Sequence, residues 1–331
     1  MRVHFQEMHS MLSEKLEQFG FNEHKANLCA KIFTESSRDG ITSHGLNRFP
    51  TFINYIKKGY VKPEKEPVLM KTSGAIEIWD GQLGPGPLNA KKSMERAIQL
   101  AKTHTIGCLA LQNTNHWMRG GTYGWQAAEA GMAAICFTNT LPNMPPWGGK
   151  ENRLGNNPLV IAIPNEPAHL VLDMAMTQFA YGKITDCRLR GVNLPVAAGY
   201  DSEGVLTMEP TKILEGGRIL PAGFWKGSGL SLMLDLLGAL LSGGRTSRDI
   251  GQLENEYGIS QIFICFDLAS LHAAEELKDS IKNSLDYLKS SATVGDEEIT
   301  YPGERTFQRR AESNRLGILV DQEIWEKVKA L

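Results

Sequence analysis

The sequence has few cysteines and no long apolar segment, and these two shortages exclude several classes of protein. Its 331 residues include five cysteines, which are scattered along the chain without a Cys-x-x-Cys pair. A disulfide framework or a thiolate zinc site is therefore not expected. No apolar run approaches the ~20 residues that a membrane span needs, and the first residues lack the hydrophobic core of a signal peptide. We expect a cytoplasmic protein with mostly buried cysteines.

An excess of charge of one sign is also missing, as are the common nucleotide and hydrolase motifs. The 35 basic and 37 acidic residues give a net charge of −2, so a nucleic-acid or membrane-surface partner is not expected. No Gly-x-Gly-x-x-Gly lies between a strand and a helix, and no P-loop or Gly-x-Ser-x-Gly occurs. The histidines show no spacing typical of a metal site. The usual dinucleotide fold, a P-loop enzyme and a serine hydrolase are therefore not indicated.

The hydrophobic patterns and the length of the chain predict a mixed α/β protein, with two domains rather than one. Helical spacing dominates the first sixty residues, with Gly20 and Gly40 as stops and Asn22 as a cap. Further on, short apolar or alternating runs predict strands, separated by helical patterns such as 88–103. These strands lie near 75–81, 106–111, 132–137, 159–163, 169–172 and 259–266. The fold class is a mixed sheet flanked by helices, with a small helical unit at the beginning; the last two helices follow Pro302 and Asp321.

The segment from Thr42 to Pro50 contains the first candidate site. His44 and Arg48 are four residues apart, which places them on one face if the segment is helical. An imidazole can move a proton and a guanidinium can hold a carboxylate, as a small acid substrate requires. Ser43 could orient the ring or bind the substrate. The alternative is structural: Ser43 is an N-cap, His44 a first-turn residue and Arg48 a solvated side chain.

Two further polar residues follow predicted strands, where α/β proteins usually bind ligands. His116 comes after the strand that ends near Leu111, and it could bind substrate or assist His44. Asp173 ends the run 169–172, where its carboxylate could bond an imidazole and favour the charged form of His44. The alternatives are a loop histidine bonded to local backbone and an aspartate that caps the next segment.

The stretch Gly227-Ser228-Gly229 precedes a helix that is apolar nearly all round. Its N–H groups, together with Lys226, could hold a phosphate at a helix N-terminus. The alternative is that small residues allow the helix to begin close to a neighbour. The helix itself, 230–241, is too short to cross a bilayer and predicts a core or subunit contact, with the core favoured.

Motifs spread over essentially the whole chain resemble the type 2 malate/L-lactate dehydrogenase family, in which they occur in the same order. They are Ser43-His44-Gly45 with Arg48, Asn115-His116, Pro146-Trp147-Gly148, Gly155-Asn156-Asn157-Pro158, Asp173-Met174-Ala175, Gly182-Lys183, Lys226-Gly227-Ser228-Gly229 and Asn314-Arg315. The segments 123–129, 144–148 and 256–264 are similar to the 2,3-diketo-L-gulonate reductase branch of that family. Met176 departs from the pattern, because many relatives have a small hydroxylated residue there.

The resemblance implies a fold that binds a nicotinamide cofactor without the usual glycine motif. It implies a helical domain, 1–72 with 226–298, packed on an α/β domain, 73–225 with 299–331, and a homodimer that shares its active-site region. His44 matches the proton donor and Arg48 the carboxylate-binding position, with Asp173, His116 and Ser43 as further catalytic candidates. The residues that match cofactor contacts are Ala168, His169, Leu170, Val171, Leu172, Asp173, Met174, Phe224, Trp225, Gly303, Glu304 and Arg305.

The resulting hypothesis is an oxidoreductase that uses NADH, in preference to NADPH, to reduce the C2 carbonyl of 2,3-diketo-L-gulonate. The nearest alternative is the same chemistry on malate, lactate, sulfolactate, ureidoglycolate or a cyclic imino acid. A non-catalytic small-molecule binder is a further alternative, and a hydrolase lacks an activated nucleophile or a metal set. No metal is expected.

Overall fold

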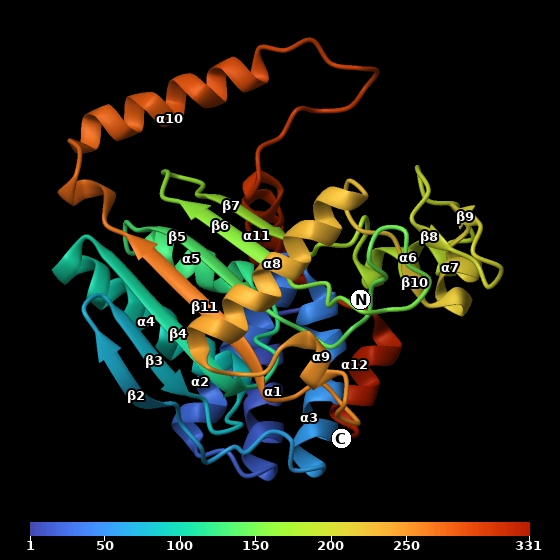
Figure 1. The fold of residues 1–331 in the computed structure, drawn as a ribbon, viewed down its shortest axis with the longest axis horizontal. Coiled ribbons are helices and arrows are strands. Elements are labelled where there is room, and N and C mark those ends of the chain that lie inside the picture. The colour runs from blue at the N-terminus through green and yellow to red at the C-terminus, as the bar shows by residue number, and fades with distance from the viewer.

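A seven-stranded mixed sheet forms the centre of the computed structural model, which describes all residues 1–331 (Figure 1). Only β3 and β4 pair in parallel, and every other neighbouring pair is antiparallel. The predicted fold class is therefore confirmed. In spatial order the strands are β2 (Val68–Ser73), β3 (Ile76–Asp80), β4 (Ile106–Thr114), β11 (Ile259–Phe266), β5 (Ala133–Thr138), β6 (Leu159–Ile163) and β7 (Leu170–Met174).

This topology brings several candidate residues to one edge of the sheet. Because β4 and β5 both run antiparallel to β11, and β6 reverses once more to β7, the carboxyl ends of β3, β4, β5 and β7 share an edge. His116 follows β4 and Asp173 lies near the end of β7. The amino end of β11 lies at the same edge. Residues that are far apart in the sequence therefore meet there.

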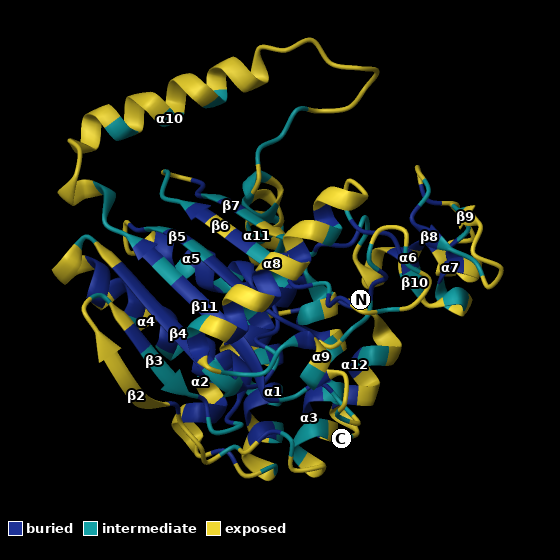
Figure 2. Cartoon of the chain, in the orientation of Figure 1, coloured by how far each residue is buried: buried dark blue, intermediate teal, exposed yellow.

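Helices cover both faces of the sheet. α4 (Gly86–His104) and α5 (Gly121–Glu129) pack on one face, and α8 (Trp225–Ser242) packs on the other. Much of the sheet has the dark blue of buried residues in Figure 2, and Leu109, Phe263 and Ala162 are fully buried. Only one side of α8 reaches this core, since Leu234 is buried whereas Leu240 is 78% exposed. The expectation that α8 lies in the core is therefore correct for one side of the helix only.

A second core unites the two ends of the chain. It lies among α1 (Phe5–Gln18), α2 (Glu23–Arg38), α3 (Phe49–Lys57) and α12 (Gln322–Lys329), while β1 (Arg2–Val3) pairs with β12 (Ile318–Leu319). Asn22 caps α2 and Asp321 caps α12, as the sequence predicted. Trp325 and Val328 bury α12 in this helical unit, although the implied domain division assigned them to the α/β part. That division also assigned β2 and β11 to the helical part, whereas both pair within the sheet.

A small lobe, residues 181–219, was not predicted as a unit. It contains α6 (Tyr181–Leu189), α7 (Pro210–Gly216), β8 (Gly199–Tyr200), β9 (Leu206–Thr207) and β10 (Arg218–Ile219). Its strands have two residues each, which is too short for an alternating pattern to be visible in the sequence. Ile184, Leu194 and Ile213 form its own buried cluster. Gly182 brings α6 next to Ser43, since a Cβ there would lie 3.3 Å from the Ser43 Cβ.

One helix extends away from the rest of the molecule. α10 (Ala274–Lys289) buries no residue and runs along the top of Figure 1, and Figure 2 colours it almost entirely as exposed. Its apolar residues nevertheless recur at helical spacing, at Leu277, Ile281, Leu285 and Leu288. The remaining elements are α9 (Ser247–Ile250), α11 (Glu304–Leu316) and the 3-10 turns η1 (Thr42–His44), η2 (Leu46–Arg48) and η3 (Leu268–Ser270).

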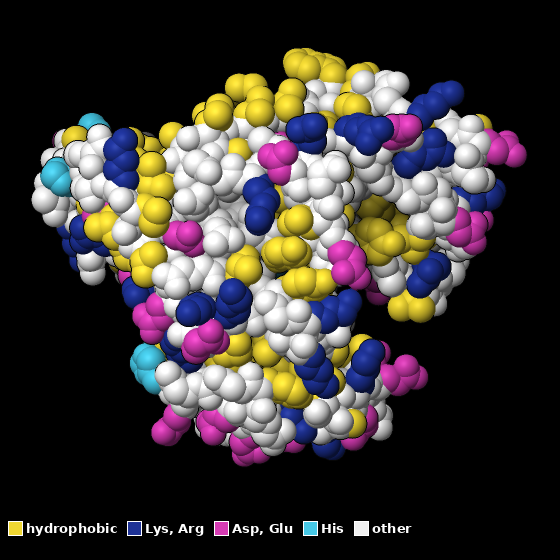
Figure 3. Space-filling view, turned by 60° about the horizontal axis from the view of Figure 1, so that its bottom comes forward, with side chains coloured by type: hydrophobic (Ala, Val, Ile, Leu, Met, Phe, Trp, Pro, Cys, Tyr) yellow, Lys and Arg dark blue, Asp and Glu magenta, His cyan; other side chains and the backbone are white.

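The cysteine side chains lie in the core, and charged side chains of both signs lie on the surface. All five cysteines are buried and unpaired. None of the helices combines the length and apolar character that a membrane crossing requires. Basic and acidic side chains intermingle on the face shown in Figure 3 instead of gathering into a field of one sign. No group of three or more His, Cys, Asp or Glu side chains has the arrangement of a metal site.

Candidate active site

His44 and Arg48 are positioned by two consecutive 3-10 turns, and the single α-helical turn expected from the sequence does not form. His44 ends η1, Arg48 ends η2, and α3 begins only at Phe49. Gly45, between the turns, has φ −107° and ψ −125°. A Cβ there would lie 2.2 Å from the Ser37 Oγ, which also accepts the Leu46 N–H at 2.9 Å. The close packing of Gly45 on α2 therefore sets the angle between the two side chains.

The His44 ring contacts Ser43 and stacks on His116. The Ser43 Oγ lies 3.0 Å from the His44 Nδ1, which leaves Nε2 as the ring nitrogen free for a substrate. The rings of His44 and His116 are nearly parallel, with an interplanar angle of 17° and centroids 5.8 Å apart. Two residues 72 positions apart in the chain thus form one surface, as the hypothesis of a shared site requires.

His116 is held as the tautomer that donates from Nε2. Its Nδ1 accepts the backbone N–H of Met118 at 3.0 Å, so the proton of the neutral ring is on Nε2. Burial lowers the pKa of His116 well below its ordinary value, and the charges of Arg48 and His44 lower it further. His116 is therefore a neutral hydrogen-bond donor at neutral pH, suited to hold an oxygen of a substrate.

Asp173 acts on His44 through its charge and not through a hydrogen bond. Its Oδ2 accepts the N–H of Gly121, the first residue of α5, at 2.7 Å, and no hydrogen bond joins it to His44. This bond is made to a helix that precedes Asp173 in the chain, so it is not the cap of the next segment that the sequence offered as an alternative. Burial lowers the pKa of His44, the Asp173 carboxylate raises it, and Arg48 lowers it again, with a net lowering. Asp173 offsets this lowering without reversing it, so His44 is not kept charged as expected.

Arg48 is a cation without a carboxylate partner. No acidic side chain lies within salt-bridge distance of its guanidinium, although its charge acts on His44, His116 and Glu256. It lines a small cavity together with His116 and Tyr55. A half-buried guanidinium without a protein anion is a good site for a ligand carboxylate, because the planar fork can bind both oxygens.

The three segments that match cofactor contacts lie together around β7. The Val171 N–H donates to the Pro302 carbonyl at 2.9 Å, which places the start of α11 beside the beginning of β7. Gly303 has φ +102°, and a Cβ there would lie 2.4 Å from the His169 carbonyl oxygen, so only glycine allows this approach. The first-turn N–H groups of Arg305 and Thr306 have no hydrogen-bond acceptor in the protein. They are free to hold a phosphate group.

At the other end of β7 the chain reaches the start of α8. The Ala222 N–H donates to the Met176 carbonyl at 2.8 Å, and this contact brings Phe224 next to the end of β7. Phe224 is half-exposed, and its ring lies 5.0 Å from that of Trp147. Exposed aromatic rings of this kind suit a planar nicotinamide or adenine. The arrangement fits an extended dinucleotide that follows β7 from α11 to α8.

The structure explains two sequence features near α8, namely Gly227 and Met176. Gly227 lies within α8, where a Cβ would meet the Ala222 carbonyl oxygen at 2.5 Å, so the small residue serves the close packing of the helix. Met176, the departure from the family pattern, is fully buried in the core beneath α8. At the turn after β7, where many relatives have a hydroxylated residue, this chain therefore has a side chain that packs into the core.

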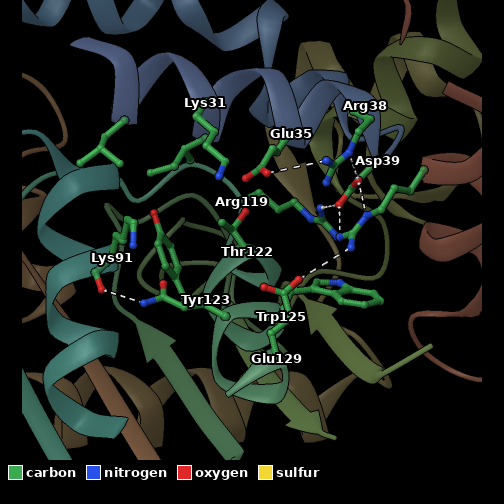
Figure 4. Close-up of a pocket in the computed structure, with 14 residues that line it drawn as sticks. Lys31, Glu35, Arg38, Asp39, Lys91, Arg119, Thr122, Tyr123, Trp125 and Glu129 are labelled. Atoms are coloured by element: carbon green, nitrogen blue, oxygen red, sulfur yellow. Dashed lines mark hydrogen bonds and ion pairs between the residues drawn. The ribbon is translucent and has the colours of Figure 1, made fainter. Parts of the chain in front are cut away.

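Behind the histidine pair lies a buried ion network that sequence reasoning missed. Asp39 is 2% exposed and accepts from Arg119 Nη1 at 2.6 Å, from Arg310 at 2.8 and 2.9 Å and from Arg38 at 3.0 Å (Figure 4). Burial raises the pKa of Asp39, but the Arg310 hydrogen bond and the arginine charges outweigh this and lower it overall. Arg119 also lowers the pKa of His44. Nothing in the local sequence indicates a pairing across 80 positions.

This network forms one wall of a cleft whose volume is about 170 Å³. Arg38, Asp39 and Arg119 converge at one end of it, and Trp125 and Glu129 form another side (Figure 4). None of the sequence-predicted catalytic residues lines this cleft. The cleft is therefore separate from the candidate active site.

Comparisons with known proteins agree with this geometry. The family model described as malate/L-lactate dehydrogenase matches residues 3–329. The 2,3-diketo-L-gulonate reductases of Escherichia coli (strain K12) and Shigella boydii serotype 4 (strain Sb227) are each 44% identical over 333 residues, covering 100% of both chains.

Solved structures resemble the whole fold. Sulfolactate dehydrogenase from Methanocaldococcus jannaschii has a TM-score of 0.91 at 32% identity, covering 100% of this chain and 96% of the other. Malate dehydrogenase from Pyrococcus horikoshii OT3 has a TM-score of 0.89 at 29% identity, covering 99% and 93%.

Proposed function

Since this chain belongs to the malate/L-lactate dehydrogenase family, we propose that it reduces the C2 carbonyl of 2,3-diketo-L-gulonate to give 3-keto-L-gulonate, with NADH as reductant. The chain is an oxidoreductase acting on the CH–OH group, as its relatives are. The observation that carries the choice of substrate is the 44% identity to 2,3-diketo-L-gulonate reductases over the full length of both chains. The stacked histidines beside an unpaired arginine supply the groups that a keto acid needs.

Each residue of the site has a separate role in the proposed reaction. Arg48 pairs with the C1 carboxylate through two parallel hydrogen bonds. The neutral His116 donates from Nε2 to a substrate oxygen. When bound, NADH supplies the hydride that adds to C2. His44 donates a proton from Nε2 to the oxygen that becomes the hydroxyl, and Ser43 fixes the orientation of the ring through Nδ1.

Substrate binding also adjusts the proton donor. The charge of Arg48 is one cause of the lowered pKa of His44, and Asp173 opposes it. A substrate carboxylate paired with Arg48 offsets that positive charge. The pKa of His44 therefore rises when the substrate binds, which favours the protonated imidazole at the moment when it is needed.

The cofactor lies along β7 in this proposal. The free N–H groups at the start of α11 hold a phosphate, and Phe224 with Trp225 contacts a ring of the cofactor. The contact residues are those predicted at 168–174, Phe224, Trp225 and 303–305. We propose NADH in preference to NADPH on the likeness to the diketogulonate reductase branch.

A homodimer in the cytoplasm is part of the proposal. Two apolar surfaces of the chain have no partner within it, namely the outer side of α8, with Met233 and Leu240 exposed, and the stripe of α10 with Leu277 and Ile281. Hydrophobic side chains gather in several patches on the face shown in Figure 3. A second copy that covers these surfaces makes a closed assembly. Five unpaired cysteines agree with a reducing compartment.

A substrate panel tests the function. The purified chain is mixed with NADH or NADPH and with 2,3-diketo-L-gulonate, pyruvate, oxaloacetate, sulfopyruvate or a cyclic imino acid, and oxidation of the cofactor is followed by its near-ultraviolet absorbance. Ureidoglycolate is tested in the oxidative direction. We expect the highest kcat/KM for 2,3-diketo-L-gulonate with NADH. A higher kcat/KM for another substrate would identify that compound as the substrate instead. If the chain binds NADH but no acid in the panel causes NADH to be oxidised, it is a non-catalytic binder.

A further inference from the structure

A buried glutamate at the edge of the sheet takes no part in the mechanism described so far. Glu256 lies in the loop before β11, at the edge where β4 and β5 end, and it is 6% exposed. Two aromatic rings fix this loop, because Tyr257 stacks on Tyr60 with centroids 4.7 Å apart. The Tyr60 hydroxyl donates to Glu254 at 3.1 Å. Glu256 therefore has a defined position and is not a mobile surface residue.

The Glu256 carboxylate is only half satisfied. Its Oε2 accepts the backbone N–H of Leu141 at 3.0 Å, while Oε1 has no hydrogen-bond partner in the protein. No lysine or arginine lies within salt-bridge distance. Burial raises the pKa of Glu256, and the Leu141 N–H and the Arg48 charge oppose this rise. Oε1 is not one of the fully enclosed side-chain oxygen atoms that lack a partner, so it keeps some access and can accept a hydrogen bond from a ligand.

The loop that carries Glu256 contacts residues that line a small cavity beside Arg48, although Glu256 itself does not line it. The Tyr60 ring, which stacks on Tyr257, lies 5.6 Å from the Tyr55 ring, and the Tyr60 carbonyl accepts a hydrogen bond from the Asn115 Nδ2 at 3.0 Å. The Glu256 charge acts on Tyr55, and the Arg48 charge acts on Glu256. Tyr55, Arg48 and His116 line one cavity. A keto acid whose C1 carboxylate pairs with Arg48 and whose carbonyl meets His44 therefore has the remainder of its carbon chain to place in this region.

We propose that Glu256 is a specificity-determining residue that accepts hydrogen bonds from hydroxyl groups on the substrate tail and repels a second carboxylate. The inference rests on the proposed function and names the chemical feature that the site selects. A polyhydroxylated tail offers O–H donors to a carboxylate oxygen. The tail of a dicarboxylic keto acid offers only acceptors and a like charge. The methyl group of pyruvate has neither property and serves as a reference.

The test compares Glu256→Gln with wild type on three substrates at pH 8: 2,3-diketo-L-gulonate, oxaloacetate and pyruvate. The amide keeps the size of the side chain and removes its charge. We expect kcat/KM to fall about tenfold or more for diketogulonate, since a hydrogen bond to a charged group is lost. For oxaloacetate we expect a rise of about tenfold, as removal of a like charge allows, while pyruvate changes little.

Two variants control for other effects. Glu254→Gln removes the charge of an exposed carboxylate in the same loop but keeps an oxygen that can accept the Tyr60 hydroxyl, so it should leave all three values unchanged. Glu256→Asp keeps the charge and should retain the discrimination against oxaloacetate, even if its shorter side chain weakens binding of the hydroxylated tail. NADH binding, followed by fluorescence, shows that each variant is folded.

The outcomes separate this inference from the proposed function. An equal loss on all three substrates in Glu256→Gln shows that Glu256 only supports Arg48 or the loop, and it overturns the inference. Unchanged ratios between the substrates overturn it as well. Failure of the wild type to reduce diketogulonate overturns the proposed function alone. The role of Glu256 is then decided by the ratio of kcat/KM for oxaloacetate to kcat/KM for pyruvate. This ratio must rise in Glu256→Gln.

Discussion

The Asp39→Asn variant tests the ion network behind the active site. Asp39 is 2% exposed and Arg119, its closest partner, has a side chain that is 6% exposed, so this pair is shielded from water. Removing one partner of such a pair typically costs about 3–5 kcal/mol, because the remaining charge stays buried without compensation. Arg38 and Arg310 have side chains that are 16% and 20% exposed and can regain some hydration. We therefore expect a loss near the lower limit, about 3 kcal/mol.

The assay is urea-induced unfolding followed by intrinsic fluorescence, and Asp186→Asn is the matched control. Asp186 pairs with Arg190 at 3.5 Å on an exposed helix, where about 1 kcal/mol or less is expected. The pH dependence gives a second signature. Because the pKa of Asp39 is lowered in the folded state, its stabilising contribution is present above the ordinary carboxyl value of about 4 and is lost as pH falls through the folded value.

At neutral pH a loss in Asp39→Asn no larger than in Asp186→Asn would mean that the Asp39 charge does not stabilise the buried ion network. A difference between Asp39→Asn and wild type that persists unchanged at strongly acid pH would mean the same. Either result would mean that the three arginines are hydrated or rearranged and do not depend on the Asp39 charge.

Three further predictions concern activity and assembly. His44→Ala should reduce kcat by about 10²–10⁴, as loss of a positioned proton donor does, with little change in the NADH dissociation constant; unchanged turnover would contradict the assignment. Arg48→Lys should raise the substrate KM about tenfold or more, because an ammonium cannot form the two-point fork, and an unaltered KM would leave Arg48 a structural role. Leu240→Glu, on the exposed side of α8, should shift the mass measured by light scattering from dimer to monomer, and a persistent dimer would place the interface elsewhere.

The sequence predicted the elements that depend on local patterns. The continuous apolar runs became β4 and β5, and Asn22 and Asp321 cap their helices, because hydrophobic period and capping act within a few residues. It was harder to predict from the sequence which helices and strands pack together in one structural unit. α12 joins the amino-terminal helices and β11 enters the middle of the sheet through contacts between distant residues, which no local pattern encodes.

The candidate site shows the same division between local and distant interactions. His44 and Arg48 could be identified by residue type, but their arrangement on two turns depends on the contact between Gly45 and Ser37. The pairing of Asp39 with Arg119 and the position of Glu256 became visible only in three dimensions. The three segments that we propose for cofactor binding were identified by family resemblance, since without a glycine motif their residues show no common local feature.

A crystal structure of the chain with NAD⁺ and a non-reducible analogue of the keto acid would test the proposed catalytic geometry. We expect the His44 Nε2 within hydrogen-bond distance, about 2.6–3.2 Å, of the C2 oxygen, with the nicotinamide on the opposite side of the reacting carbon and the carboxylate on Arg48. A nicotinamide ring that lies away from β7, or a His44 ring beyond reach of that oxygen, would mean that His44 is not the proton donor for hydride transfer at this site.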